Sequence, residues 1–140
     1  MRKRSRLRHA HKRSDVPVPR GTMRLRKEMA IIVPSTKRFN ERVSKAEVKR
    51  RVREVRDFLT NTFGGTTRIR GTGSYASFKR KKIVDEPVVV VECFADSGKW
   101  MSQNRKVVDF IERKAKEWGQ ENIGFEFETD MFLVEPKGAA

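Results

Sequence analysis

Residues 44–65 read SKAEVKRRVREVRDFLTNTFGG, and this stretch predicts one long amphipathic helix. Ser44 followed three residues later by Glu47 is a capping box, which marks a helix start. Gly64 and Gly65 end the helix. Between these signals the apolar residues recur at helical spacing: Val48, Val52, Val55, Leu59 and Phe63. A helix with a single apolar stripe must pack that stripe against another element.

The segments on either side of this helix predict strands and one further helix. Residues 30–33 form a short apolar strand that Pro34 ends. Residues 66–77 are rich in β-formers but interrupted by glycines, which predicts a bulged edge strand. Residues 83–95 and 123–134 are further strands, and residues 100–118 carry a second helical stripe that ends at Gly119.

The resulting order is β-α-β-β-α-β. Two helices with one apolar stripe each must cover one face of the sheet. We therefore predict an α+β fold, the ferredoxin-like βαββαβ sandwich, with two helices on one face of a four-stranded antiparallel sheet. Residues 28–136 form this domain, and residues 137–140 are a C-terminal tail.

The first 27 residues differ in character from the rest of the chain. They hold 11 Lys or Arg and one acid, Asp15, and have no periodic apolar pattern. The run from Val16 to Pro19 alternates valine and proline, which resists a helix. Such a segment cannot bury enough apolar surface to offset its ordering entropy, so residues 1–27 are predicted to be a disordered basic arm and linker.

Charge and cysteine content limit the classes of function. The 140 residues carry a net charge of +15, which favours a polyanionic partner, with nucleic acid first. The single cysteine, Cys93, excludes an intramolecular disulfide and leaves no Cys/His set for structural zinc. No apolar run approaches the roughly 18 residues of a membrane span. The sequence therefore predicts a cytoplasmic protein without membrane contact.

Three groups of basic residues are predicted to bind the phosphate backbone with low sequence specificity. They lie in the arm, in one sector of the first helix, and in the loop that joins the second and third strands. These residues are Arg2, Lys3, Arg4, Arg6, Arg8, Lys12, Arg13, Arg24, Arg26, Lys27, Lys45, Lys49, Arg50, Arg53, Arg56, Lys79, Arg80, Lys81 and Lys82.

The third strand is apolar on both faces, since Val88 and Val90 share one face while Val89 and Val91 share the other. The two helices cover one face of the sheet. The open face is therefore expected to meet another surface, and a homodimer through it, or a partner protein seated there, is predicted.

Enzymatic alternatives find less support. His9 and His11 flank Ala10 as in a metal-binding His-hydrophobe-His pair with Tyr75 as nucleophile, but the arm leaves the two imidazoles unfixed. The acids at 126, 128 and 130 alternate as the solvent side of an amphipathic strand would. Cys93 is expected to be buried. We therefore predict no catalytic residue, no metal site and no cofactor.

The chain resembles a loose group of small prokaryotic and viral proteins of unknown function. The resemblance covers residues 29–135 and rests on a helix that ends in Phe63-Gly64-Gly65, a Glu86-Pro87 strand and a Gly119-Gln120-Glu121 turn. It implies the boundaries of the fold and no catalytic residue.

Taken together, these features predict a non-enzymatic nucleic-acid-binding protein. Two alternatives stay open. One is a structural subunit of a ribonucleoprotein or virion, and the other is a small-ligand or regulatory module with an incidental basic tail.

Overall fold

The computed structural model describes residues 16–38, 40–77 and 81–138. Residues 16–26 lead into the fold, and the predicted disorder of residues 1–15 lies outside the described residues. The elements in chain order are β1 (Lys27–Pro34), β2 (Thr36–Lys37), β3 (Glu41–Arg42), α1 (Lys45–Phe63), β4 (Thr67–Ser77), β5 (Lys82–Ala95), α2 (Ser97–Glu117), β6 (Ile123–Phe127) and β7 (Asp130–Val134).

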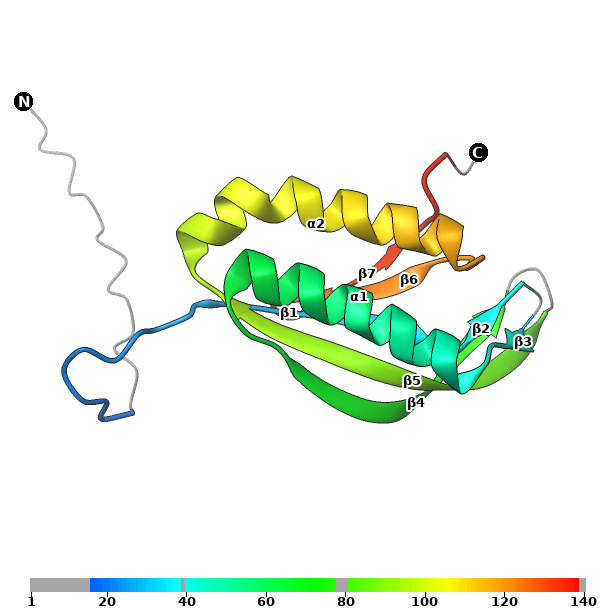
Figure 1. Ribbon diagram of the computed structural model, residues 1–140, viewed down its shortest axis with the longest axis horizontal. Helices are drawn as coiled ribbons and strands as arrows, with labels where there is room; N and C mark the ends of the chain where they lie inside the picture. Colours follow the sequence, from blue (N-terminus) through cyan, green and yellow to red (C-terminus); the bar gives the residue numbers. More distant parts are fainter. Residues whose placement is uncertain (1–15, 39, 78–80, 139–140) are drawn as a thin grey trace, which may run out of the picture.

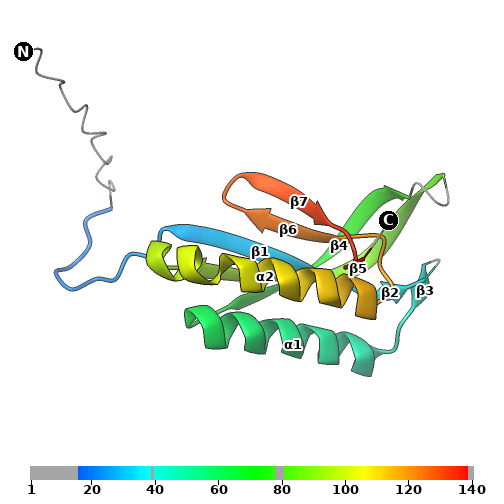
Figure 2. The same ribbon diagram turned by 90° about the horizontal axis from the view of Figure 1, so that it is seen from above.

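The fold is mixed α/β, with two helices and a five-stranded antiparallel sheet in the order β4-β5-β1-β6-β7. Both helices lie on the same side of the sheet and run antiparallel to each other (Figures 1 and 2). The Ser44 hydroxyl oxygen accepts a hydrogen bond from the Glu47 amide, so Ser44 caps α1 as the sequence predicts. Gly64, with a φ of 111°, ends α1 in the left-handed region that glycine tolerates.

The core fills the space between the helices and the sheet. Alternate residues of β1 point into it, namely Met29, Ile31 and Val33, and each is at most 1 % exposed. From the helices come Val55 and Leu59 of α1, and Val107, Ile111 and Ala115 of α2. Cys93 on β5 is buried among them, as the sequence predicts.

Two details of the predicted sheet are wrong. Residues 123–134 form a hairpin of two strands rather than one, because Glu128 adopts a φ of 57° and turns the chain back. The edge strand β4 has no bulge, since its pairing with β5 runs in unbroken register from Thr67↔Glu92 to Ser77↔Lys82. Gly73 packs against Val88 within this regular pairing, since a Cβ at position 73 would lie 3.4 Å from Val88 Cγ1.

The face of the sheet away from the helices carries exposed apolar side chains. Ile69, Phe94, Met131 and Leu133 all lie there, and Leu133 is 63 % exposed. This agrees with a third strand that is apolar on both faces, while the homodimer through this face stays a prediction. No helix in the described part of the chain is long and apolar enough to cross a membrane.

The β4–β5 hairpin extends beyond the central sheet. Strand β1 pairs with β5 only as far as Pro34↔Val88, whereas β4 continues alongside β5 to Ser77↔Lys82. Past Pro34 the chain turns into the small β2–β3 hairpin, which lies beside this extension (Figures 1 and 2). This end of the molecule, where the two hairpins meet the end of α2, positions the candidate site.

Candidate functional site

A pocket of about 380 Å³ lies where the two hairpins meet the end of α2, and we call it the hairpin pocket. The β2–β3 hairpin, the extended part of β4–β5, and the turn between α2 and β6 each supply part of its wall. The lining residues are Thr36, Lys37, Arg38, Asn40, Tyr75, Ser77, Val84, Ala115, Lys116, Gly119, Gln120, Glu121 and Pro136.

One face of the β4–β5 extension forms a wall of this pocket. Tyr75 lies directly opposite Val84, so these two residues and their neighbours two positions away, Ser77 and Glu86, share that face. Ser77, Val84 and Glu86 are buried, while the Tyr75 ring is 38 % exposed. The Ser77 hydroxyl donates to Glu121 at 2.8 Å and so ties this wall to the turn after α2.

Glu86 is a carboxylate that is only 5 % exposed. Its Oε2 accepts from the Thr36 hydroxyl at 2.7 Å and from the Ser35 amide at 3.3 Å. A buried carboxylate needs such donors, because an unpaired charge away from water is costly. Glu86 therefore sits directly behind Thr36, a residue of the pocket wall.

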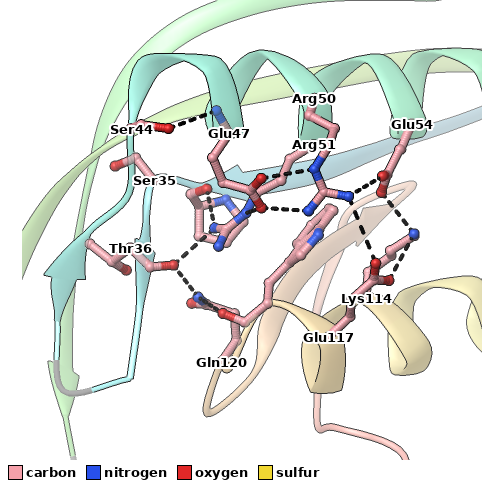
Figure 3. Close-up of polar contacts among 12 residues, drawn as sticks. Ser35, Thr36, Ser44, Glu47, Arg50, Arg51, Glu54, Lys114, Glu117 and Gln120 are labelled. Carbon is pink, nitrogen blue, oxygen red and sulfur yellow. Dashed lines mark hydrogen bonds and ion pairs between the residues drawn. The ribbon is translucent and has the colours of Figure 1, made fainter.

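Thr36 joins several buried polar groups, and Figure 3 shows the contacts of its carbonyl oxygen with Arg51 and Gln120. While its hydroxyl donates to Glu86, its carbonyl oxygen accepts from Arg51 Nη1 at 2.9 Å and from Gln120 Nε2 at 2.6 Å. Arg51 Nη1 also donates to the Pro34 carbonyl at 2.9 Å. Side chains from α1 and from the turn after α2 thus hold the short β2 segment in place.

Arg51 is 2 % exposed and lies on the apolar side of α1. Its guanidinium stacks over the Trp118 ring at 5.2 Å, and its Nε donates to Glu47 at 3.2 Å. Burial lowers the pKa of Arg51, and the contact with Glu47 partly offsets this. An arginine stays cationic under these conditions, so Arg51 brings a permanent positive charge close to Glu86.

Ion pairs on the surface join α1 to α2 beside these buried contacts. Lys114 of α2 lies 2.7 Å from Glu54 of α1 and 2.9 Å from Glu117, and Arg50 contacts both Glu47 and Glu54 at 2.7 Å. Burial opposes protonation of Lys114, but its two carboxylate partners outweigh it and raise the pKa. Hydrogen bonding from Arg50 is the largest cause that lowers the pKa of Glu47. These pairs fix the two helices against each other at the hairpin-pocket end.

The hairpin pocket combines groups that suit a small polar molecule. Three exposed cations, Lys37, Arg38 and Lys116, line its mouth and favour an anionic group. Asn40 Oδ1 is buried with no hydrogen-bond partner among the described residues, so it can accept from a ligand amine. The Tyr75 ring offers an aromatic face. Within the described ranges no cluster of three or more His, Cys, Asp or Glu could hold a metal ion.

A second hollow, the far groove, lies at the opposite end of the sandwich. Its volume is about 440 Å³, and its walls come from the segment before β1, the end of α1, and strands β4 and β5. Met23, Leu25, Phe63 and Phe94 supply apolar surface, and Glu92 is its one ionisable lining residue. Although it is slightly larger, it has no convergent set of polar groups, so the hairpin pocket is the stronger candidate site.

The structure scatters the predicted phosphate-binding residues. Arg24 and Arg26 lie exposed before β1, and Lys27 pairs with Glu128 at 3.7 Å. Lys45, Lys49 and Arg53 are exposed on α1, as are Lys81 and Lys82 at the tip of β4–β5. The residues outside the described part of the chain are Arg2, Lys3, Arg4, Arg6, Arg8, Lys12, Arg13, Lys79 and Arg80.

Two of the predicted helix cations are engaged by acids. Arg50 is held by Glu47 and Glu54, and Arg56 Nη2 contacts Asp57 at 2.7 Å. These two cations of the predicted helix sector are therefore paired with acids of the same helix. Paired charges at i, i+3 and i, i+4 neutralise each other locally.

The fold is similar to solved structures of a phage enzyme. The phage SAM lyase in complex with S-methyl-5'-thioadenosine superposes with a TM-score of 0.59 and 10 % sequence identity, over 81 % of this chain and 92 % of that chain. A phage SAM lyase in the apo state gives a TM-score of 0.58 at 13 % identity, over 85 % of this chain and 98 % of that chain. No protein-family model matches the chain, and no curated protein sequence matches it.

These likenesses contradict the prediction of a non-enzymatic nucleic-acid-binding protein. Both matched structures are of an enzyme, and the ligand in one of them is a small molecule. The prediction fails because it took net charge as evidence of function, although net charge bears on association and solubility and not on the site. The same two matched structures contradict the prediction that the chain is not an enzyme.

Sequence reasoning missed the residues that build the hairpin pocket, although signals for them were present. Arg51 follows Val48 by three residues and precedes Val55 by four, which places a cation within the apolar stripe of α1. Glu86 and Gln120 both belong to the motifs that carry the resemblance to uncharacterised proteins. Those motifs, far apart in the chain, meet at the hairpin pocket.

Proposed function

We propose that this protein is an enzyme that binds S-adenosylmethionine (SAM) in the hairpin pocket and cleaves it as a lyase, on a ferredoxin-like fold. The observation that carries the proposal is the buried Glu86 carboxylate behind the wall of a polar pocket. The fold likeness to the phage SAM lyase supports it.

The chemical groups of SAM suit those of the hairpin pocket. The molecule carries a sulfonium and an ammonium group, and a buried carboxylate attracts either cation strongly where water is scarce. Its carboxylate suits the cations at the pocket mouth, its adenine ring can stack on Tyr75, and the adenine amino group can donate to Asn40 Oδ1.

We take S-methyl-5'-thioadenosine, the molecule in complex with the phage SAM lyase, as the product, and this choice defines the bond that breaks. S-methyl-5'-thioadenosine keeps the methyl and adenosyl groups on sulfur, so the bond between sulfur and the γ-carbon of the amino-acid chain breaks. Sulfur takes the electron pair and becomes a neutral thioether. A lyase adds no water, so the γ-carbon gains its new electron pair within the four-carbon fragment. The pair comes either from the fragment's own carboxylate with ring closure, or from the neighbouring β-C–H bond, whose proton is released to solvent.

Glu86 lies behind the pocket wall at Thr36, and it is proposed to attract and orient one of the substrate's cations from there. Both of its hydrogen bonds among the described residues fall on Oε2, so Oε1 is the oxygen proposed to act toward the pocket. Holding the chain of the substrate in one geometry lowers the entropy that must be lost to reach the transition state.

The test is the release of S-methyl-5'-thioadenosine from SAM by the full chain, followed by chromatography, with proton NMR to identify the four-carbon product. Glu86→Gln removes the charge and keeps the shape, and a loss of about 100-fold in kcat/KM is expected. Glu92→Gln is the matched control, because Glu92 belongs to the same strand but borders the far groove. It is expected to stay within about twofold.

Two outcomes would overturn the proposal. If the folded wild-type chain releases no S-methyl-5'-thioadenosine from SAM, it does not have the proposed lyase activity. If Glu92→Gln loses as much kcat/KM as Glu86→Gln, the activity is not located at the hairpin pocket.

A further inference from the structure

We infer that Arg51 is a positioning residue that sets the geometry of Glu86 through the Ser35–Thr36 segment, an inference that rests on the proposed function. Neither Arg51 nor Glu86 is among the residues that line the hairpin pocket, but Glu86 lies directly behind Thr36, which does line it. The influence of Arg51 on a bound molecule must therefore pass through other residues.

The contacts of Arg51 converge on one short stretch of backbone. Nη1 donates to the carbonyl oxygens of Pro34 and Thr36, at 2.9 Å each, and so bridges the two ends of the Ser35–Thr36 segment. Charge-assisted hydrogen bonds of this kind are shorter and stronger than neutral ones. The bridge fixes the turn that the chain makes after β1.

That same segment supplies both donors that Glu86 uses. The Ser35 amide and the Thr36 hydroxyl reach Glu86 Oε2 at 3.3 Å and 2.7 Å. The Ser35 hydroxyl also donates to the Pro87 carbonyl at 2.6 Å, which ties the segment to the residue next to Glu86. A shift of the segment therefore moves the carboxylate.

Two further contacts hold Arg51 itself in one orientation. Glu47 accepts from its Nε, and the Trp118 ring lies under its guanidinium. Gln120 meets Arg51 on the Thr36 carbonyl, so a residue that lines the pocket shares the same acceptor. A buried ion pair is weak evidence for stability by itself, since apolar replacements are often as stable. The hydrogen bonds that link Arg51 to Glu86 through Ser35 and Thr36 indicate that Arg51 also positions this carboxylate.

The experiment compares Arg51→Met with Arg53→Met, which changes an exposed arginine two residues further along the same helix. Arg51→Met is expected to lower kcat for release of S-methyl-5'-thioadenosine by about 10- to 100-fold. Arg53→Met is expected to stay within about twofold. All variants are assayed at a temperature at which thermal unfolding shows them to be folded.

A double-mutant cycle separates positioning from general destabilisation. If Arg51 acts through Glu86, Arg51→Met costs nothing further once Glu86→Gln is present. Equal losses in both backgrounds would overturn the inference and leave the proposed function intact, whereas an inactive wild-type chain would overturn the proposed function.

A second readout needs no activity. The Ser35 amide donates to Glu86, so its hydrogen exchange, measured by NMR, is expected to speed up at least about tenfold in Arg51→Met beyond the change in global stability. Unchanged exchange at Ser35 would overturn the inference even if the wild-type chain proves inactive.

If Arg51→Met does not fold, two variants of Thr36 test the same route to Glu86. Thr36→Val removes the hydroxyl that donates to Glu86 and keeps the shape of the side chain, whereas Thr36→Ser keeps the hydroxyl. The loss of kcat in Thr36→Val and its recovery in Thr36→Ser are expected. Equal activity of the two variants would contradict the route through Thr36.

Discussion

Glu86 and Glu92 lie six residues apart on β5, one at the hairpin-pocket end and the other at the far groove, and their surroundings differ. Glu86 is 5 % exposed and accepts two hydrogen bonds from the β1–β2 turn. Glu92 is half-buried and borders the far groove, among apolar residues of the linker and of β5. Both carboxylates belong to one strand, and the difference in their burial comes from the elements that pack around each.

The end with the far groove is held together by aromatic stacking. The Trp100 ring at the start of α2 stacks on Phe127 with a centroid distance of 4.2 Å and approaches Phe63 and Phe125 at 6.4 Å and 6.3 Å. Such contacts stabilise the fold without burying a charge. One end of the sandwich therefore secures the fold, while the other holds buried polar groups beside a pocket.

The largest effect on stability is therefore expected at the aromatic end. Trp100→Ala removes the stacked ring and leaves a cavity, which costs about 3 kcal/mol of unfolding free energy in urea denaturation. Once the folded fraction is allowed for, kcat/KM for SAM stays within about twofold, because Trp100 is remote from the hairpin pocket. A specific loss of turnover in this variant would break the division between the two ends.

A smaller effect is expected at the helix starts, which lie at opposite ends of the molecule (Figure 1). The Ser44 hydroxyl caps α1 at the pocket end, and the Asp96 carboxylate caps α2 at the other by accepting from Gly98 and Lys99. Ser44→Ala and Asp96→Ala are each expected to cost about 1 kcal/mol in urea denaturation. Ser44→Ala also loosens the first turn of α1 beside Glu47, so hydrogen exchange there increases while the start of α2 stays protected. The reverse pattern would contradict the assigned caps.

The smallest effect concerns pH and again distinguishes the pocket end. Since the pKa of Glu47 is lowered in the folded state, its contribution to stability is present above its ordinary value of 4.5 and is lost as the pH falls through the folded value. Glu47→Gln is expected to flatten the decline of unfolding free energy below about pH 4.5. Arg50→Met removes the largest cause of the shift and should flatten the same part of the curve. An unchanged slope in both variants would contradict the assignment.

Much of the fold is readable from residues 44–65 outward, because capping residues and apolar periodicity act within one element. The fifth strand of the sheet, β7, cannot be predicted in this way. Its turn is made by Glu128, which adopts the left-handed region without being glycine or asparagine, so the sequence carries no local signal for it.

The site could not be predicted in the same way, because its contacts join distant parts of the chain. Thr36 and Glu86 are 50 residues apart, and Thr36 and Gln120 are 84 apart. The spacing of Arg51 places it in the apolar stripe of α1. Because the chain has a large surplus of cations, however, the sequence favours a functional role for the exposed basic face of the helix and does not single out Arg51. Charge composition is a property of surfaces, whereas the hairpin pocket depends on a few charges that are buried.

The burial of Cys93 provides the chain with an internal reporter. It is the one cysteine of the sequence, it lies 1 % exposed in the middle strands, and burial raises the pKa of its thiol to about 11. Thiol reagents attack the thiolate, which the folded state both shields and disfavours at neutral pH. Alkylation therefore proceeds only in molecules whose central strands have separated, and its rate measures how often that happens, without any added label.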